Sequence, residues 1–208
     1  DCSSRGLGDV YKRQPLNRHL TVFNGTLKPL NINTFLTLKM RIQFTKYHGT
    51  GNDFILVDNR EMMFPRENTA LCRRLCHRNF GIGADGLMLL QNHPDFDFEM
   101  VYFNSDGNES SMCGNGGRCI VHFAKSLGLI AEKATFLAID GKHTATIDAA
   151  GQVCLGMNDV TKVETSDGAF VMDTGSPHYV TFRENVNEIN VDKSGRQIRN
   201  SRLYVAEG

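Results

Sequence analysis

The sequence predicts an α/β (α+β) protein, because strand-like and helix-like stretches alternate along most of its length. Short apolar or alternating runs bounded by glycine and asparagine are typical of strands, and they occur at 41–47, 54–59, 86–91 and 97–104. Two longer stretches, 67–83 and 119–130, have the spacing of amphipathic helices. An Asp-Gly dipeptide between alternating runs further along indicates a β-hairpin.

The first helix is expected between two strands, after a glycine-rich turn at 48–53. Asn68 or Thr69 can cap its N-terminus, Leu71 and Leu75 repeat at i and i+4, and Gly81 lies beyond its end. This spacing predicts a short helix with one apolar face.

The second helix follows a polar loop, and Gly128 marks its end. Its apolar face is formed by Ile120, Phe123, Ala124 and Leu127. The stretch 134–148 then predicts the hairpin, with Asp140-Gly141 as the two central residues of a type I′ turn. One more strand is expected within 151–157.

The chain of 208 residues divides into three parts by composition. Residues 1–39 lack sustained periodicity and are interpreted as a non-native or disordered leader before Met40. Residues 40–157 form the first domain. Residues 158–208 begin a second domain with new strand-like runs at 169–182, and about 50 residues are too few to bury a comparable core.

Composition excludes several classes of protein. The 23 basic and 23 acidic residues balance and form no basic run, which argues against a nucleic-acid surface, and no apolar stretch suits a membrane span. The six cysteines lack a framework spacing, and no signal peptide is evident. We therefore expect a cytoplasmic protein with free thiols.

The most informative stretch is NSDGNESSMCGNGGRC, which runs from Asn104 to Cys119. It places Cys113 directly before a glycine-rich helix start, where unpaired backbone N–H groups and the helix dipole favour an anion. The same field stabilises a thiolate. The loop can thus hold a carboxylate and present a base beside it.

Two chemistries are compatible with such a thiolate. It can remove a proton from the carbon next to a bound carboxylate, as a general base, or it can act as a nucleophile. The nucleophile needs a histidine partner, for which His48, His122 and His178 are available without a recognisable motif.

The loop resembles the signature of the diaminopimelate epimerase family. FTKYHGTGNDFILVD, RNFGIGADGLMLL and TGSPHYV also match this family in order and approximate spacing, so the resemblance covers the chain from Met40 onward. It implies a curved mixed sheet wrapped around the helix that follows Cys113. It also implies a second domain of pseudo-symmetric plan, only partly present here.

The resemblance implies cofactor-independent epimerisation of LL-diaminopimelate to the meso form, for lysine and peptidoglycan synthesis. Two cysteines act on opposite faces of the α-carbon, and Cys113 matches one of them. Gly114 and Asn115 match the cradle for the substrate carboxylate, while Asn52 and Asn104 match substrate-binding asparagines. Asp106 and Arg118 are expected to shape the loop.

Three positions depart from the family pattern, and one of them, Asn108, stands where a serine is usual and is expected to be tolerated. Gly86 stands where some members carry a glutamine that contacts the substrate, and Ser176, a weaker substrate-binding candidate, stands where many carry asparagine. The departures at Gly86 and Ser176 leave fine substrate selectivity open.

The second catalytic cysteine, expected in a Cys-Gly-Thr-Gly context, is absent from the 208 residues. We therefore expect the chain to be a fragment that is inactive alone. Family resemblance allows a homodimer for the full-length protein. A related racemase or isomerase of another small amino or hydroxy acid, and a non-catalytic carboxylate-binding domain, remain alternatives.

Cys72, Cys76 and His77 have a spacing that could suggest zinc. No further ligands of a tetrahedral site are evident. We interpret the two cysteines, and Cys119, as packing residues.

Overall fold

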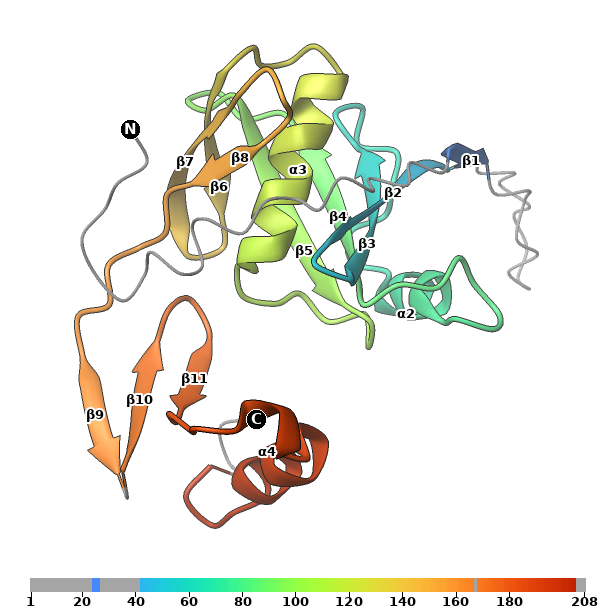
Figure 1. The fold of residues 1–208 in the computed structure, drawn as a ribbon. Coiled ribbons are helices and arrows are strands. Elements are labelled where there is room, and N and C mark those ends of the chain that lie inside the picture. Colours follow the sequence, from blue (N-terminus) through green and yellow to red (C-terminus); the bar gives the residue numbers. More distant parts are fainter. Residues whose placement is uncertain (1–23, 27–41, 167, 205–208) are drawn as a thin grey trace. The chain divides into compact units, whose positions relative to one another are not determined.

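The computed structural model describes residues 24–26, 42–166 and 168–204. It divides into two compact units, one up to Asn158 and one from Asp159 (Figure 1). The strands of the first unit are β1 (Asn24–Thr26), β2 (Gln43–Gly49), β3 (Asn52–Asp58), β4 (Gly86–Gln91), β5 (Phe98–Asn104), β6 (Lys133–Ala138), β7 (Gly141–Ile147) and β8 (Val153–Leu155). Its helices are α2 (Thr69–Cys76) and α3 (Gly114–Ser126).

The eight strands form one mixed sheet in chain order, β1 to β8. The pairs β3–β4 and β5–β6 are parallel, and the other neighbours are antiparallel. Parallel neighbours need a crossover connection. Helix α2 lies in the connection from β3 to β4, and α3 lies in the connection from β5 to β6.

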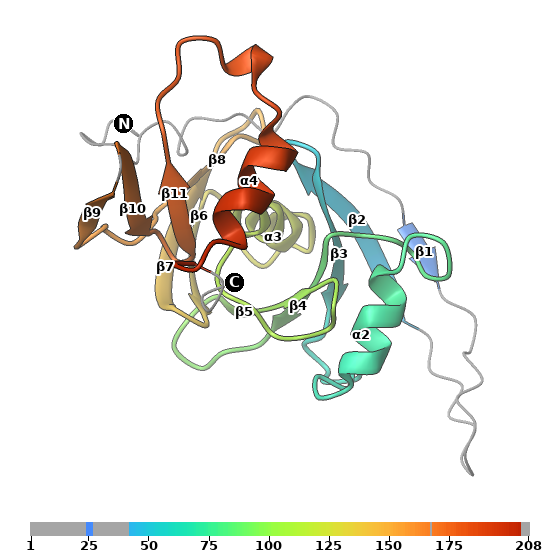
Figure 2. The same cartoon turned by 90° about the horizontal axis from the view of Figure 1, so that it is seen from below.

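The sheet curls around α3. This helix contacts β2, β3 and β4 in one half of the sheet and β7 and β8 in the other. A flat sheet could not bring strands so far apart in the order onto one helix, and Figure 2 shows the strands arranged around α3. The expected fold class, a curved mixed sheet wrapped around the helix after Cys113, is confirmed.

Strand β4 is buried along its whole length because the sheet has a helix on each face. Met88 and Leu90 pack into the core around α3. Leu87 and Leu89 point the other way, into a second core with α2. This explains why the strand reads as a continuous apolar run, as strands buried on both faces do.

Helix α2 begins, and helix α3 ends, close to the predicted signals, whereas α2 ends at Cys76, five residues before the expected stop at Gly81. The Asn68 side chain accepts a hydrogen bond from the Leu71 N–H (2.9 Å) and caps α2. Helix α3 begins directly after Cys113, and Gly128 adopts a positive φ of 73° just beyond its end. A glycine in this conformation terminates a helix without steric cost.

The predicted type I′ turn at Asp140-Gly141 is wrong. Ala138 pairs with Gly141, so the two loop residues of that hairpin are Ile139 and Asp140, neither of which has positive φ. Positive φ at both loop residues, which type I′ requires, occurs instead at Thr50 (55°) and Gly51 (90°) between β2 and β3.

The second unit has a three-stranded antiparallel sheet in the order β11–β10–β9. Its elements are β9 (Val163–Ser166), β10 (Ala169–Asp173), β11 (Pro177–Val180), the 3-10 helix η1 (Val186–Glu188) and α4 (Val191–Arg199). The sequence patterns predicted the region of β10 and β11 but not β9 or α4. Ala169 is the buried hydrophobic residue among the described residues of this unit, whereas Phe182 and Val191 are exposed.

Most of the interpreted leader, including Met40, lies outside the described residues. The described residues 24–26 form β1, which pairs antiparallel with β2. In the described part of the chain, no helix combines the length and the apolar character needed to cross a membrane.

Four of the cysteines carry free thiols, namely Cys72, Cys76, Cys113 and Cys119. The expectation of free thiols is confirmed for these four.

Candidate functional site

The candidate site lies where the ends of three neighbouring strands, β3, β4 and β5, meet the start of α3. Asn52 is the first residue of β3, Gly86 is the first residue of the parallel strand β4, and Asn104 ends β5. Gly86 pairs with Asn104 across the antiparallel ladder. Residues from three distant segments of the sequence are therefore collected at one edge.

Cys113 is the residue immediately before the first turn of α3. Its backbone is extended (φ −109°), it makes no side-chain cap bond, and its carbonyl accepts the hydrogen bond from the Gly117 N–H at 2.7 Å. The N–H groups of Gly114 to Gly116 precede that bond, so they have no acceptor within the helix. With no acidic residue in the first turn, this end of α3 is suited to an anion.

Glycines open α3 because the helix start is tightly packed. A Cβ atom on Gly116 would lie 2.4 Å from Met88 Cε, and one on Gly117 would lie 2.7 Å from Leu155 Cδ2. A Cβ on Gly49, at the end of β2, would lie 3.1 Å from the Asn115 Cβ. Neither Gly116 nor Gly117 has positive φ, so a sharp turn of the backbone is not what these glycines provide. They allow close packing instead.

Three of the predicted site residues come together at this point. The Asn52 Oδ1 accepts from the Cys113 thiol, with a sulfur–oxygen distance of 3.6 Å, and from the Asn115 Nδ2 at 3.3 Å. The strained turn at Thr50 and Gly51 places Asn52 there, and the Thr50 hydroxyl lies 3.4 Å from the Asn115 Oδ1. Cys113 is half-buried, whereas the other three free cysteines are buried.

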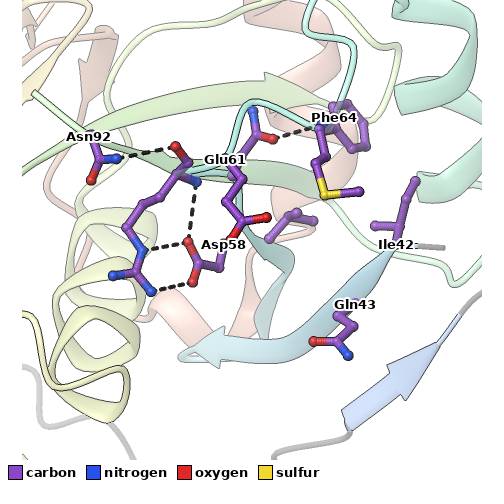
Figure 3. Close-up of a pocket in the computed structure, with 10 residues that line it drawn as sticks. Ile42, Gln43, Asp58, Glu61, Phe64 and Asn92 are labelled. Carbon is purple, nitrogen blue, oxygen red and sulfur yellow. Dashed lines mark hydrogen bonds and ion pairs between the residues drawn. The ribbon is translucent and has the colours of Figure 1, made fainter. Parts of the chain in front are cut away.

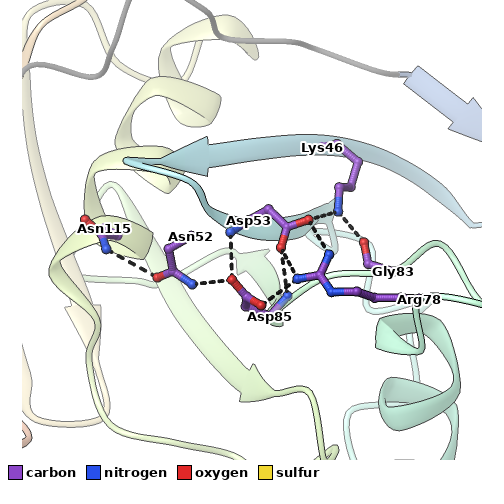
Figure 4. Close-up of polar contacts among 7 residues, drawn as sticks. All are labelled: Lys46, Asn52, Asp53, Arg78, Gly83, Asp85 and Asn115. Carbon is purple, nitrogen blue, oxygen red and sulfur yellow. Dashed lines mark hydrogen bonds and ion pairs between the residues drawn. The ribbon is translucent and has the colours of Figure 1, made fainter. Parts of the chain in front are cut away.

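A network of charged side chains is hydrogen-bonded to Asn52 (Figure 4). The Asn52 Nδ2 donates to the Asp85 Oδ2 at 2.8 Å, and Arg78 donates to the other oxygen of Asp85 at 2.6 Å. Arg78 also bonds Asp53 at 2.9 Å, and Lys46 bonds the opposite oxygen of Asp53 at 2.6 Å. Two cations and two carboxylates thus alternate along this edge.

The charges have a clear effect on Asp53. Burial by itself would raise the pKa of this carboxyl group, but hydrogen bonds from Arg78 and Lys46 outweigh that effect. The pKa falls to about 2. The carboxylate is therefore ionised at neutral pH and well below it.

Asn104 takes part in a different set of contacts. Its Nδ2 donates to the Ser110 hydroxyl at 2.9 Å, and its backbone N–H bonds the Asn108 carbonyl. Asp106 accepts from the Asn108 N–H at 2.9 Å and so closes the loop. Gly107 has a φ of 89° and approaches α2 so closely that a Cβ would lie 2.1 Å from the Thr69 carbonyl oxygen. The loop is thus held by its own hydrogen bonds and by close packing against α2.

Gly86, which departs from the family pattern, packs directly against Tyr102. A Cβ atom on Gly86 would lie 2.5 Å from the Tyr102 Cε2 and 2.7 Å from the Phe103 carbonyl oxygen. The tyrosine ring therefore occupies the space that a side chain at position 86 would need. Burial, followed by the nearby Cys113, raises the pKa of the Tyr102 hydroxyl.

Ser176 lies in the second unit, in the turn between β10 and β11, and is described with that unit alone. Its carbonyl oxygen accepts from the Thr174 N–H at 3.1 Å and lies 2.7 Å from the His178 Nδ1.

The other free thiols differ from Cys113 because they are buried. Burial raises the pKa of Cys72 to about 11 and that of Cys76 and Cys119 to about 12. Across residues 24–26, 42–166 and 168–204, no group of three or more His, Cys, Asp or Glu side chains could hold a metal ion. His122 faces the Tyr47 hydroxyl at 3.4 Å, whereas the thiol of Cys113 faces an amide.

A cavity of about 640 Å³ lies elsewhere, at the opposite end of β3 (Figure 3). It is lined by residues that include Ile42, Asp58, Arg60, Glu61 and Phe64. Arg60 is engaged by a bidentate ion pair with Asp58, at 2.8 and 2.6 Å. None of the predicted site residues lines this cavity.

Sequence reasoning identified Cys113, Asn52 and Asn115 but overlooked Asp85, Arg78 and Lys46. All three lie inside the motifs that matched the family, so the signal was available. Their role could not be assigned because ion pairs between strands β2, β3 and the loop before β4 depend on the sheet register.

Comparison with known proteins identifies the family of this chain. A sequence model of the family described as diaminopimelate epimerase matches residues 44–163. The diaminopimelate epimerase of Flavobacterium psychrophilum is 55% identical over 163 residues, covering 78% of this chain and 64% of that protein. That of Nitratiruptor sp. is 37% identical, covering 74% of this chain and 62% of that protein. The chain thus spans less than two thirds of the length of these relatives.

Solved structures share the fold at low sequence identity. A PhzF-family phenazine biosynthesis protein of Bacillus anthracis aligns with a TM-score of 0.50 at 14% identity, covering 77% of this chain and 54% of that one. A probable proline racemase of Agrobacterium radiobacter aligns with a TM-score of 0.50 at 16% identity, covering 71% and 54%. These structures share the curled sheet around a central helix and so indicate the fold. The sequence matches indicate the family. The chain belongs to the diaminopimelate epimerase family.

Proposed function

We propose that this chain supplies one half of the acid–base machinery of a cofactor-independent epimerase that converts LL-diaminopimelate to the meso form. The observation that carries the proposal is the half-buried thiol of Cys113 at the uncapped N-terminus of α3, beside Asn52 and Asn115. An uncapped helix start is suited to the substrate α-carboxylate, and a thiol beside it reaches the α-carbon.

In the proposed reaction the Cys113 thiolate takes the α-proton. The C–H bond breaks, an S–H bond forms, and the electron pair stays on the α-carbon and spreads into the carboxylate. The N–H groups of Gly114 and Asn115 face this carboxylate and stabilise the developing charge. A second thiol on the opposite face returns a proton, so the configuration inverts. In the reverse direction the two sulfur atoms exchange roles.

Substrate recognition is assigned by the same proposal. Asn52 and Asn104 bind polar groups of diaminopimelate, and Ser176 is a further substrate-binding residue in the proposal. The enzyme acts in the cytoplasm, with a homodimer as its full-length form. Residues 40–157 act as the first epimerase domain and 158–208 as the start of the second.

The test uses the longest protein that the gene encodes. It measures how fast this protein incorporates deuterium at the α-carbon of LL-diaminopimelate in D₂O. We expect exchange and epimerisation, and we expect Cys113→Ala to abolish both. Cys119→Ala is the matched control, because Cys119 is a fully buried thiol two turns along the same helix. An active Cys113→Ala protein would contradict the assignment of Cys113.

The 208-residue chain on its own makes a second test. It contains no cysteine followed by Gly-Thr-Gly, so the opposite face lacks its acid. We expect negligible LL-to-meso turnover by the purified chain. Robust turnover would mean that the two-cysteine mechanism does not apply.

A further inference from the structure

Two amide side chains next to Cys113 are joined in a hydrogen-bonded chain that ends in a charge on each side. Arg118 donates to the Asn115 Oδ1, and the Asn115 Nδ2 donates to the Asn52 Oδ1 at 3.3 Å. The Asn52 Nδ2 then donates to the Asp85 Oδ2 at 2.8 Å. A guanidinium can only donate and a carboxylate can only accept. Both amides must therefore point the same way, with their oxygens toward Arg118 and their nitrogens toward Asp85.

The direction of this series of hydrogen bonds determines which atom of the Asn52 amide faces the Cys113 sulfur. As oriented, the Asn52 Oδ1 lies 3.6 Å from the Cys113 Sγ and accepts from the thiol. A carbonyl oxygen can bond a protonated thiol but has no proton to offer a thiolate. If the Asn52 amide were reversed, its N–H would face the sulfur and would favour the thiolate instead. The orientation of one amide thus selects which form of Cys113 is supported.

Asp85 cannot easily turn away from Asn52. Arg78 holds its Oδ1 at 2.6 Å, and the Asp53 N–H holds its Oδ2 at 3.2 Å, on the same oxygen that Asn52 uses. The Asp85 N–H in turn bonds the Asp53 Oδ1 at 3.1 Å. Donors therefore approach this carboxylate from two sides and use both of its oxygens (Figure 4).

We infer that Asp85 is a positioning residue for Cys113, which acts through the Asn52 amide and holds the cysteine in the form of a hydrogen-bonded thiol until substrate engages Asn52. The inference rests on the proposed function only in treating Cys113 as the acid–base group. Its test requires no substrate, so it can fail while the epimerase assay succeeds, and the reverse.

The test measures the rate at which iodoacetamide alkylates Cys113 at a fixed pH of about 7.5, read on the peptide that contains this residue by mass spectrometry. An asparagine at position 85 has a single acceptor oxygen, which cannot serve Arg78 and Asn52 on opposite sides. We expect Asp85→Asn and Asp85→Ala each to raise the rate about three- to tenfold, the range of one lost hydrogen bond. The reactive form is the thiolate, which the released amide no longer opposes.

A double-mutant cycle separates positioning from general loosening of the structure. If Asp85 acts through Asn52, Asp85→Asn should change the rate by less than about 1.5-fold in the background of Asn52→Ala. Asp58→Asn is the matched control, because Asp58 is an arginine-paired carboxylate at the other end of β3. Alkylation of the buried Cys119 reports local unfolding, and we expect it to stay unchanged in every variant.

Two results would overturn the inference. One is an unchanged rate in Asp85 variants that retain the circular dichroism spectrum of the unsubstituted protein. The other is an equal rise with and without Asn52.

The unsubstituted protein supplies a second measurement if the variants do not fold. Nuclear Overhauser contacts from the Asn52 Nδ2 protons should be strong to the Asp85 Hβ protons and weak to the Cys113 Hβ protons. The opposite ranking would show a reversed amide and would also refute the inference.

Discussion

The stability of the first unit should depend on pH through Asp53. Lys46 and Arg78 approach its two oxygens at 2.6 and 2.9 Å, and the pKa falls from 3.8 to about 2. That difference corresponds to about 2.5 kcal/mol of favourable interaction with the ionised form. The side chain is 21% exposed, so solvent screening reduces the expected contribution to about 1.5 kcal/mol.

The sign follows from the direction of this pKa. Because the folded value lies below the unfolded one, the contribution is fully present above about pH 4 and disappears as the pH falls through about 2. We expect Asp53→Asn to lower the free energy of unfolding by about 1.5 kcal/mol at pH 6 and by about half as much at pH 3. The other carboxylates contribute equally to the free energy of unfolding of both proteins, so their contributions cancel when the two proteins are compared at the same pH.

Urea denaturation at pH 6, 4 and 3 measures these differences. The chain has no tryptophan, so unfolding is followed by far-ultraviolet circular dichroism. Asp95→Asn serves as the control, since Asp95 is an exposed carboxylate in the loop before β5, and it should change stability little at any pH. An Asp53→Asn difference that stays constant from pH 6 to pH 3 would refute the reasoning.

Two further substitutions test close packing and a buried hydrogen bond. Gly86→Ala should lower the free energy of unfolding by about 1–3 kcal/mol in urea denaturation, because the added Cβ would lie 2.7 Å from the Phe103 carbonyl oxygen. Gly195→Ala, with nothing within 4 Å, should be neutral or slightly stabilising, and equal effects at the two sites would contradict the steric argument. Asp140→Ala should cost about 1–3 kcal/mol, because the fully buried His143 side chain loses the hydrogen-bond partner that lies 2.9 Å from its Nε2. Thermal or urea unfolding unchanged by this substitution would show that the pair is not stabilising.

Much of the first unit could be predicted because its signals are local. Helix α2 follows from the Asn68 cap and the Leu71–Leu75 spacing, and α3 follows from its apolar face and the stop at Gly128. The run of β4 predicts a buried strand for the same reason. Each of these patterns is contained within one turn or one strand, so neighbouring residues suffice to define it.

Elements without such local patterns could not be predicted. Strand β9 is exposed and polar, and it is a strand only because β10 pairs with it. Helix α4 has a glycine in its interior and no buried residues. Its Asn190 cap and the pairing of Asp192 with Arg196 were the remaining signals, and both are individually weak.

The sequence by itself determined three residues of the candidate site but not the charged residues around them. The position of Cys113 before a glycine-rich helix start, together with the family motifs, pointed to Asn52 and Asn115 as well. Only the tertiary structure decided how these residues are oriented. Whether Asn52 offers oxygen or nitrogen to the thiol depends on Asp85, which lies 33 residues away. That contact exists because β3 and β4 pair in parallel, and the register of two strands is a property of the folded sheet rather than of either segment.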